Sequence, residues 1–232
     1  ITNAAAMSID KAWLARIKEV VDWCLANDLK VIINVHHDKW LEGRPIRQYK
    51  EENNQKLALL WMNIASEFSR YDYRVAFAGT NEVHIKDNWG KPDAENLEVQ
   101  NSYNQTFIDV VRATDGNNQK RHLIVQTYVC NPDFGLYNGD FVIPTDVEEN
   151  GNEYMSVEFH YYTPWDYAGE CKFNYWGEPY KQKGKASPSD EKTMTEFLDR
   201  VVSTWGDKGL GLVMGEWGVT ERQKAGQTDQ KA

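Results

Sequence analysis

Two kinds of apolar pattern alternate along the chain. Apolar side chains recur every three or four residues in segments 8–27, 53–71 and 94–114, and this spacing predicts amphipathic helices. A fourth helix is predicted to begin at Ser187, with Pro188 in its first turn and Asp190 three residues on, as in a capping signature. Between these segments lie short, nearly continuous apolar runs typical of buried parallel strands, at residues 31–35, 74–79, 122–127, 156–160 and 210–214.

Strict alternation of helices and strands is typical of an α/β fold, in which helices pack outside a parallel sheet. Segments 129–153 and 161–187 lack this pattern, and their glycine, proline and aromatic content predicts two long loops. No repeat, low-complexity tract or linker divides the sequence, so residues 1–232 are predicted to form a single domain. The alternation fits a doubly wound sheet and a barrel equally well.

Polar and aromatic residues follow the apolar runs at their C-terminal ends. They are His36, His37 and Asp38; Thr80, Asn81 and Glu82; Thr127 and Tyr128; His160, Tyr161 and Tyr162; and Glu216 and Trp217. In parallel α/β folds, active sites lie at this edge of the sheet. Convergence of such residues from five strands therefore predicts an active site there.

Two carboxylates stand out within this set, because Glu82 and Glu216 each follow an apolar strand directly. Cleavage of a glycosidic bond needs a proton donor for the leaving oxygen and a carboxylate opposite the anomeric carbon. Two carboxyl groups about 5–5.5 Å apart give retention of configuration, and a wider gap gives inversion. A single strand-end glutamate is most simply a surface charge, but two beside His, Asn, Tyr and Trp favour chemistry.

Four strand-end segments together resemble glycoside hydrolase family 5, the cellulase family. They are Asn34-Val35-His36-His37, Asn81-Glu82, His160-Tyr161-Tyr162 and Gly215-Glu216-Trp217-Gly218. One Asn-Glu pair is a weak signal, but four segments in this order, each after a predicted strand, are specific. The resemblance covers residues 10–220 and implies a (β/α)8 TIM barrel, with the two glutamates at the ends of its fourth and seventh strands.

The resemblance also implies a role for each matching position in a retaining, double-displacement mechanism. Glu82 would be the general acid/base, and Glu216 would be the nucleophile that forms the glycosyl-enzyme. Asn81 would bind the sugar 2-hydroxyl beside the nucleophile, and Tyr162 would orient Glu216.

Histidines and tryptophans complete the implied substrate site. His36 and His160 would bind sugar hydroxyls, whereas His37, as the adjacent residue, is a second-line candidate that could point into the barrel wall. The candidate sugar platforms are Trp40, Trp165, Trp176 and Trp217; the helical Trp13, Trp23, Trp61 and Trp205 are expected to serve packing.

The implied activity is an endo-β-1,4-glucanase that needs no cofactor or metal. Its substrate would be a β-glucan such as cellulose, mixed-linkage glucan or xyloglucan, and the run from His160 to Trp165 is similar to the endoglucanase branch of the family. A mannan-specific endo-hydrolase is an open alternative. The family implies a secreted protein, although the sequence contains no recognisable signal peptide.

The sequence departs from the family pattern in two ways. Val83 stands where proline usually follows the Asn-Glu pair. In addition, residues 1–7 and the polar tail after Thr220 offer no strand, so we expect an incomplete barrel of about strands three to seven. The family's arginine at the end of strand two and tryptophan at the end of strand eight have no counterpart, so we expect weak or no activity from these residues alone. Its two open edges would be templates for pairing with another chain, and we expect self-association through them.

The net charge bears on possible partners, and two interpretations compete with a glycoside hydrolase. The net charge of −9 disfavours nucleic acid and anionic membrane surfaces. A metal enzyme could use His36, His37, Asp38, His84, His160, Glu82 and Glu216, but adjacent histidines project differently from a strand and no His-x-His or HExxH motif is present. A non-catalytic carbohydrate-binding protein on the same fold is the second rival.

Overall fold

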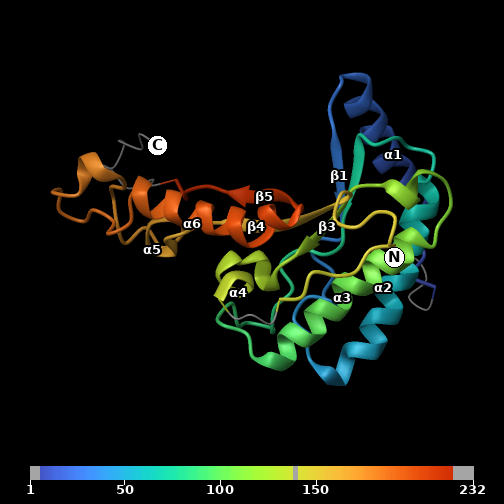
Figure 1. Cartoon of the computed structure of the whole chain (residues 1–232), viewed down its shortest axis with the longest axis horizontal. Helices are drawn as coiled ribbons and strands as arrows, with labels where there is room; N and C mark the ends of the chain where they lie inside the picture. The colour runs from blue at the N-terminus through green and yellow to red at the C-terminus, as the bar shows by residue number, and fades with distance from the viewer. Residues whose placement is uncertain (1–5, 138–140, 222–232) are drawn as a thin grey trace.

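The computed structural model describes residues 6–137 and 141–221. Within them, five parallel strands form one sheet in the order β1-β2-β3-β4-β5 (Figure 1). The strands are β1 (Val31–Asn34), β2 (Val75–Ala78), β3 (Leu123–Gln126), β4 (Met155–Tyr161) and β5 (Gly211–Trp217). A doubly wound sheet reverses its strand order at a switch point. This sheet keeps sequence order throughout, as successive strands of a barrel do.

Four longer helices precede or connect the strands. They are α1 (Lys11–Ala26), α2 (Arg47–Phe68), α3 (Ala94–Arg112) and α6 (Glu191–Trp205). Shorter turns of helix lie in the connections: η1 (Gly116–Lys120), η2 (Tyr128–Cys130), α4 (Pro132–Tyr137), α5 (Trp165–Ala168), η3 (Glu178–Tyr180) and η4 (Gly206–Lys208). Figure 1 shows α2 and α3 packed side by side, with α1 and β1 at one end of the molecule and α6 with β4 and β5 at the other.

Several predicted boundaries were wrong. Helix α2 begins at Arg47, six residues before the predicted start. Helix α6 is capped by Asp190, whose side chain accepts a hydrogen bond from the Thr193 N–H, and not by Ser187. Strand β5 continues through Trp217, three residues past the predicted end. The segments predicted as long loops contain α4, α5 and η3. The ends of helices and strands depend on backbone hydrogen bonds and caps, which the spacing of apolar residues does not encode.

The core lies between the sheet and the helices α2 and α3. Trp61 on α2 is completely buried against Phe77 and Phe107, and its indole N–H donates to the Gly79 carbonyl at 2.8 Å. Gly79 has to be glycine, because an added Cβ would lie 2.7 Å from the Phe107 ring. Trp61 therefore anchors the chain just beyond β2. Trp205 is buried as well, so two of the four helical tryptophans serve packing as expected.

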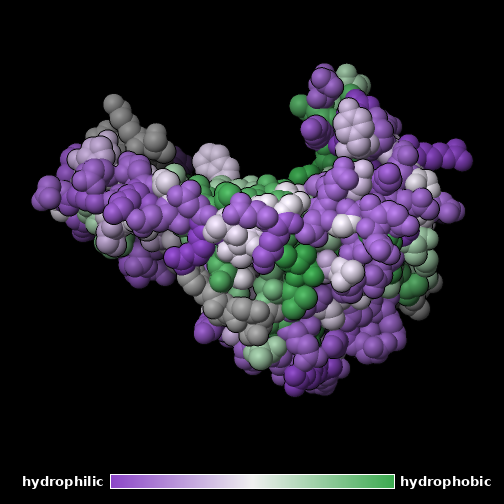
Figure 2. Space-filling model, in the orientation of Figure 1, coloured by the Kyte–Doolittle hydropathy of each residue, from purple (hydrophilic) through white to green (hydrophobic). Residues whose placement is uncertain are grey.

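The outer parts of the sheet are less covered than the apolar runs predicted. Strand β3 is buried along its whole length, but β1 alternates between half-buried and exposed residues, and Ile32 is 52% exposed. Helix α1 buries only Val21 fully, while Trp13 and Trp23 are exposed. Figure 2 shows hydrophobic surface on the α1 and β1 part and on the floor of the hollow beside it. Burial on both faces was thus correct for the central strand and wrong for the edges, against which fewer of the described elements pack.

One expectation concerns the ends of the chain. The absence of a strand before Met7 and after Thr220 falls largely outside the described residues, which exclude 1–5 and 222–232. Among the described helices, none combines the length and apolar character that crossing a membrane requires.

Candidate active site

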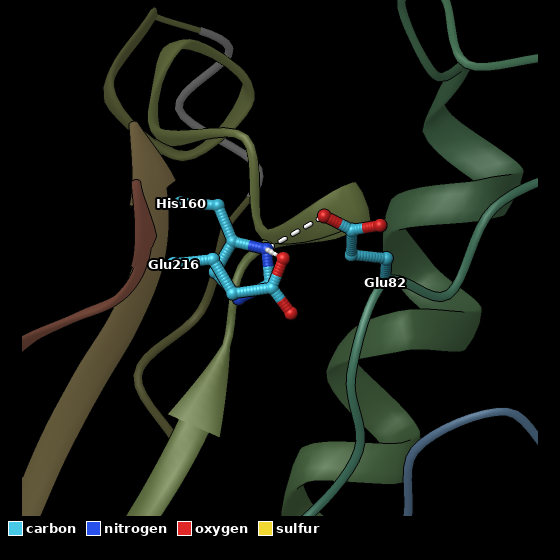
Figure 3. Close-up of side chains that lie close together, drawn as sticks. All are labelled: Glu82, His160 and Glu216. Atoms are coloured by element: carbon cyan, nitrogen blue, oxygen red, sulfur yellow. Dashed lines mark hydrogen bonds and ion pairs between the residues drawn. The ribbon is translucent and has the colours of Figure 1, made fainter. Parts of the chain in front are cut away.

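The ends of β2, β4 and β5 bring Glu82, His160 and Glu216 together. His160 and Glu216 lie within β4 and β5 and face one another in the strand register, after an irregularity between Phe159 and His160. Irregularities of this kind re-aim side chains and are frequent beside active sites. Glu82 follows β2 and approaches from the other side (Figure 3).

The two carboxylates approach the same nitrogen of the His160 imidazole ring. Nδ1 of His160 lies 2.6 Å from Oε1 of Glu82 and 3.5 Å from Oε2 of Glu216. One oxygen from each glutamate and one ring nitrogen all lie within 4.8 Å of one another. Figure 3 shows both carboxylates directed toward the ring. Such a spacing is compatible with both glutamates acting on one bond.

The protonation state of His160 follows from its surroundings. Burial lowers the pKa of the imidazole, but the close contacts with the Glu158 and Glu82 carboxylates, together with the charge of Glu216, outweigh that effect. The net result raises the pKa of His160 to about 9. The ring is therefore a cation at neutral pH, and a charged donor toward Glu82.

Glu216 has further partners from two other strand ends. The Tyr162 hydroxyl donates to its Oε2 at 3.0 Å, and His36 Nε2 lies 3.9 Å from its Oε1. Asn81 lies beside the same histidine, with Nδ2 3.4 Å from His36 Nε2. Burial, the hydrogen bond to Glu216 and nearby negative charge raise the pKa of Tyr162 to about 12, so the phenol keeps its proton and stays a donor.

The turn η2 supports the backbone that carries Glu82. The Cys130 thiol lies 3.4 Å from the Asn81 carbonyl, and the Val129 N–H donates to the Val83 carbonyl at 3.1 Å. The Ile85 N–H donates to the Tyr128 hydroxyl at 2.8 Å. Three successive residues of η2 thus hold alternate residues on both sides of Glu82. Val83 is itself buried, so it packs where the family usually has proline.

The remaining predicted residues lie outside this cluster of contacts. His37 is exposed, and its nearest charged partner is Glu42, whose Oε1 lies 3.2 Å from Nδ1. Trp40 packs against the main core, and its buried indole N–H has no hydrogen-bond partner. Trp176 is partly buried, and its indole N–H donates to Ser189 at 3.4 Å.

Two predicted platforms are largely exposed side chains. Trp165, on α5, is 57% exposed and meets Tyr162 edge-on at 6.3 Å between centroids. Trp217, at the end of β5, is 74% exposed. These are the two predicted tryptophans best placed to stack on a sugar.

Sequence reasoning missed several residues around the site. Glu158 on β4 contacts His160, and Gln126 on β3 bonds Glu158. The two-residue spacing of Glu158 and His160, which puts both on one face of the strand, was an available signal. Trp89 was also missed: it is exposed and stacks on His84 with 3.8 Å between ring centroids, in the segment after Glu82.

Among the described residues, Glu82, His160 and Glu216 form the one cluster of His, Cys, Asp and Glu close enough to hold a metal ion. The Nδ1 proton of His160 is engaged by Glu82, and a metal ion would have to displace it. We therefore do not assign these residues as metal ligands. The geometry is that of a carboxylate pair bridged by a protonated histidine.

Comparison with known proteins shows to which family the chain belongs. The sequence profile of Cellulase (glycosyl hydrolase family 5) matches residues 1–232. The chain belongs to glycosyl hydrolase family 5. A xyloglucan-specific endo-β-1,4-glucanase of Bacteroides ovatus is 34% identical over 227 residues, covering 96% of this chain and 44% of that protein. Endoglucanase A of Paenibacillus barcinonensis is 32% identical, covering 96% of this chain and 58% of that protein.

A solved family 5 structure confirms the fold. The Bacteroides ovatus xyloglucanase in complex with a XXXG heptasaccharide superimposes with a TM-score of 0.87 at 35% identity, over 97% of this chain and 49% of that one. The five-stranded sheet is therefore part of a (β/α)8 barrel, as the sequence resemblance implied. The chain spans about half the length of the relatives it matches.

Proposed function

We propose that this chain carries the catalytic glutamates of a retaining endo-β-1,4-glucanase. The observation that carries the proposal is the pair Glu82 and Glu216, each at a strand end and with oxygens within 4.8 Å of one ring nitrogen of His160. Membership of family 5 supports hydrolysis of a glycoside by this pair. The close approach supports the retaining route, because inversion needs room for a water molecule between carboxylate and sugar.

In this mechanism Glu216 attacks the anomeric carbon and Glu82 protonates the departing oxygen. Tyr162 and His36 contact opposite oxygens of Glu216 and hold the carboxylate at a fixed angle for attack. Glu82 then removes a proton from the water that hydrolyses the glycosyl-enzyme. His160 touches both carboxylates, so it can respond to the charge that moves between them.

The substrate class we propose is β-1,4-linked glucan, including xyloglucan. Support comes from relatives named endoglucanase and xyloglucan-specific endo-β-1,4-glucanase, and from a related structure that holds a XXXG heptasaccharide. The exposed rings of Trp165 and Trp217 suit this class, because a glucose unit presents a flat C–H face that stacks on an aromatic ring.

The test combines Glu216→Gly with azide rescue. We expect the variant to lower kcat on an aryl β-cellobioside by about 10⁴-fold or more, because the covalent step is lost. Azide should restore turnover and give a glycosyl azide of inverted configuration. Glu82→Ala should spare the aryl substrate but abolish hydrolysis of xyloglucan, whose leaving group needs the proton. The matched control is Glu153→Gln, at an exposed position before β4, which should act like the unaltered chain.

Three outcomes would count against the proposal. A product of inverted configuration from the unaltered chain would contradict the retaining mechanism. Hydrolysis of mannan in preference to glucan would contradict the substrate class. Binding of xyloglucan oligosaccharides with no turnover of any glycan would indicate a non-catalytic carbohydrate-binding role for the 232-residue chain.

A further inference from the structure

A third carboxylate lies beneath the catalytic pair and has no role in the mechanism above. Glu158, on β4, has a side chain that is 12% exposed. Its Oε2 accepts a hydrogen bond from Gln126 Nε2 at 2.7 Å, and its Oε1 lies 3.5 Å from His160 Nε2. A carboxylate this buried is costly unless neighbours stabilise it, so its partners matter.

The amide of Gln126 can have only one orientation. Its Oε1 accepts from both the backbone N–H and the hydroxyl of Thr80, at 2.9 and 3.1 Å. The NH₂ group must therefore face Glu158, which is an acceptor in this contact. Because Thr80 lies two residues before Glu82, the contacts form a closed circuit. It runs from the Glu82 segment through Gln126, Glu158 and His160 back to the Glu82 carboxylate.

The other side of Glu158 is closed by Gly215. A Cβ added at Gly215 would lie 1.9 Å from Glu158 Oε1, so the absence of a side chain there makes room for the carboxylate. The φ angle of Gly215 is not in the left-handed region, so glycine is not needed for the backbone itself. The lack of a side chain at position 215, directly before Glu216, therefore provides the space that the Glu158 carboxylate occupies.

Both ring nitrogens of His160 face carboxylate oxygens. Nδ1 lies 2.6 Å from Glu82, and Nε2, which is buried, has no acceptor within regular hydrogen-bond geometry and lies 3.5 Å from Glu158. Ionised Glu158 only accepts, and Oε1 of Glu82 accepts from Nδ1 even when Oε2 carries the proton that Glu82 gives up in the mechanism, so both nitrogens are placed as donors. The Nε2 contact is an ion pair rather than a well-formed hydrogen bond.

We propose that Glu158 is a positioning residue for the catalytic pair: held by Gln126, it fixes the His160 ring from below as a doubly protonated cation whose Nδ1 is directed at Glu82 and Glu216. The inference rests on the proposed function for its catalytic meaning, but the state of the ring can be observed without turnover. The other ionisable groups near the ring are Tyr162 and His36, which contact Glu216, and the buried Cys130 thiol. None of these is an anion at neutral pH that could replace Glu158.

The test uses ¹⁵N-histidine NMR on the 232-residue chain at pH 7.5. We expect both His160 nitrogens to carry a proton in the unaltered chain, with the resonances assigned by their loss in His160→Gln. In Glu158→Gln, the amide keeps the bond to Gln126 but turns its NH₂ toward Nε2, so the ring should become neutral with its proton on Nδ1. Glu153→Gln, an exposed carboxylate just before the same strand, should leave the ring a cation.

Gly215→Ala provides a second perturbation. It keeps the negative charge of Glu158 but pushes the carboxylate out of its position beside His160. It should also convert His160 to the neutral form. If His160 stays doubly protonated in both variants, with the fold retained by circular dichroism, the proposal is overturned.

Activity gives a separate readout. For a chain that hydrolyses aryl β-cellobioside, Glu158→Gln should lower kcat about tenfold and change KM little, because Glu158 does not touch substrate. An unchanged kcat would overturn the positioning role. A chain with no turnover at all would count against the proposed function, while the NMR result would still decide the inference.

Discussion

A buried ion pair at the end of the sheet opposite the site offers a strong test of what holds this fold together. Arg112, on α3, makes a two-pronged contact with Asp146, with Nε and Nη2 at 2.8 and 2.7 Å from the two carboxylate oxygens. The side chains are 3% and 0% exposed. Nη1 of Arg112 donates to the carbonyls of Asn118 and Arg121, just before β3.

The consequence of breaking this pair follows from burial. Asp146→Asn keeps the shape of the side chain but removes the counter-ion of the Arg112 guanidinium. The NH₂ group of the new asparagine would also face the N–H donors of Arg112. Removing one partner of a buried pair costs about 3–5 kcal/mol, because the remaining charge is uncompensated. Domains of this size have a free energy of unfolding of roughly 5–15 kcal/mol, so the variant should lose a large part of it.

The chain contains a matched control. Arg74 and Asp72 form a similar two-pronged contact, with Nη2 2.9 Å from Oδ2, but their side chains are 29% and 45% exposed. Asp72→Asn should therefore change the urea midpoint far less than Asp146→Asn at the same pH. Urea unfolding of both variants, followed by tryptophan fluorescence, is the assay. Equal losses would refute the reasoning that burial sets the cost of the missing charge.

Three further predictions concern pH, substrate contact and the sheet edges. The His160 pKa, raised from 6.5 to about 9, contributes about 3 kcal/mol of stability below pH 6.5 that is lost as the pH rises through 9; urea midpoints should show this loss, and His160→Gln should remove it. Trp165→Ala should raise KM for long oligosaccharides more than for short ones, whereas Trp13→Ala, at a similarly exposed position on α1, should change neither. Sedimentation should show concentration-dependent self-association through the β1 and β5 edges; Ile32→Lys should reduce it, and a monomer at all concentrations would contradict this.

The sequence determined the layout of the fold and the identity of the catalytic candidates. Short apolar runs with helically spaced segments between them specify parallel strands and covering helices, because each pattern buries its apolar side chains in only one kind of element. The strand-end segments that resemble family 5, and not the alternation, favoured a barrel over a doubly wound sheet. Glu82 and Glu216 were identifiable because a residue that directly follows a buried parallel strand must emerge at one edge of the sheet. Local pattern was sufficient for both conclusions.

Tertiary structure alone decided what surrounds these residues. The contact of Glu82 with His160 joins residues 78 positions apart, and the facing of His160 and Glu216 depends on a register irregularity that no local pattern encodes. Glu158 looked like an ordinary strand residue until Gln126 and the missing side chain of Gly215 showed how its charge is held. Likewise, only the structure showed that Trp165 is exposed enough to contact a sugar, whereas Trp176 is partly buried. Protonation and accessibility depend on neighbours in space, and a linear pattern records only neighbours along the chain.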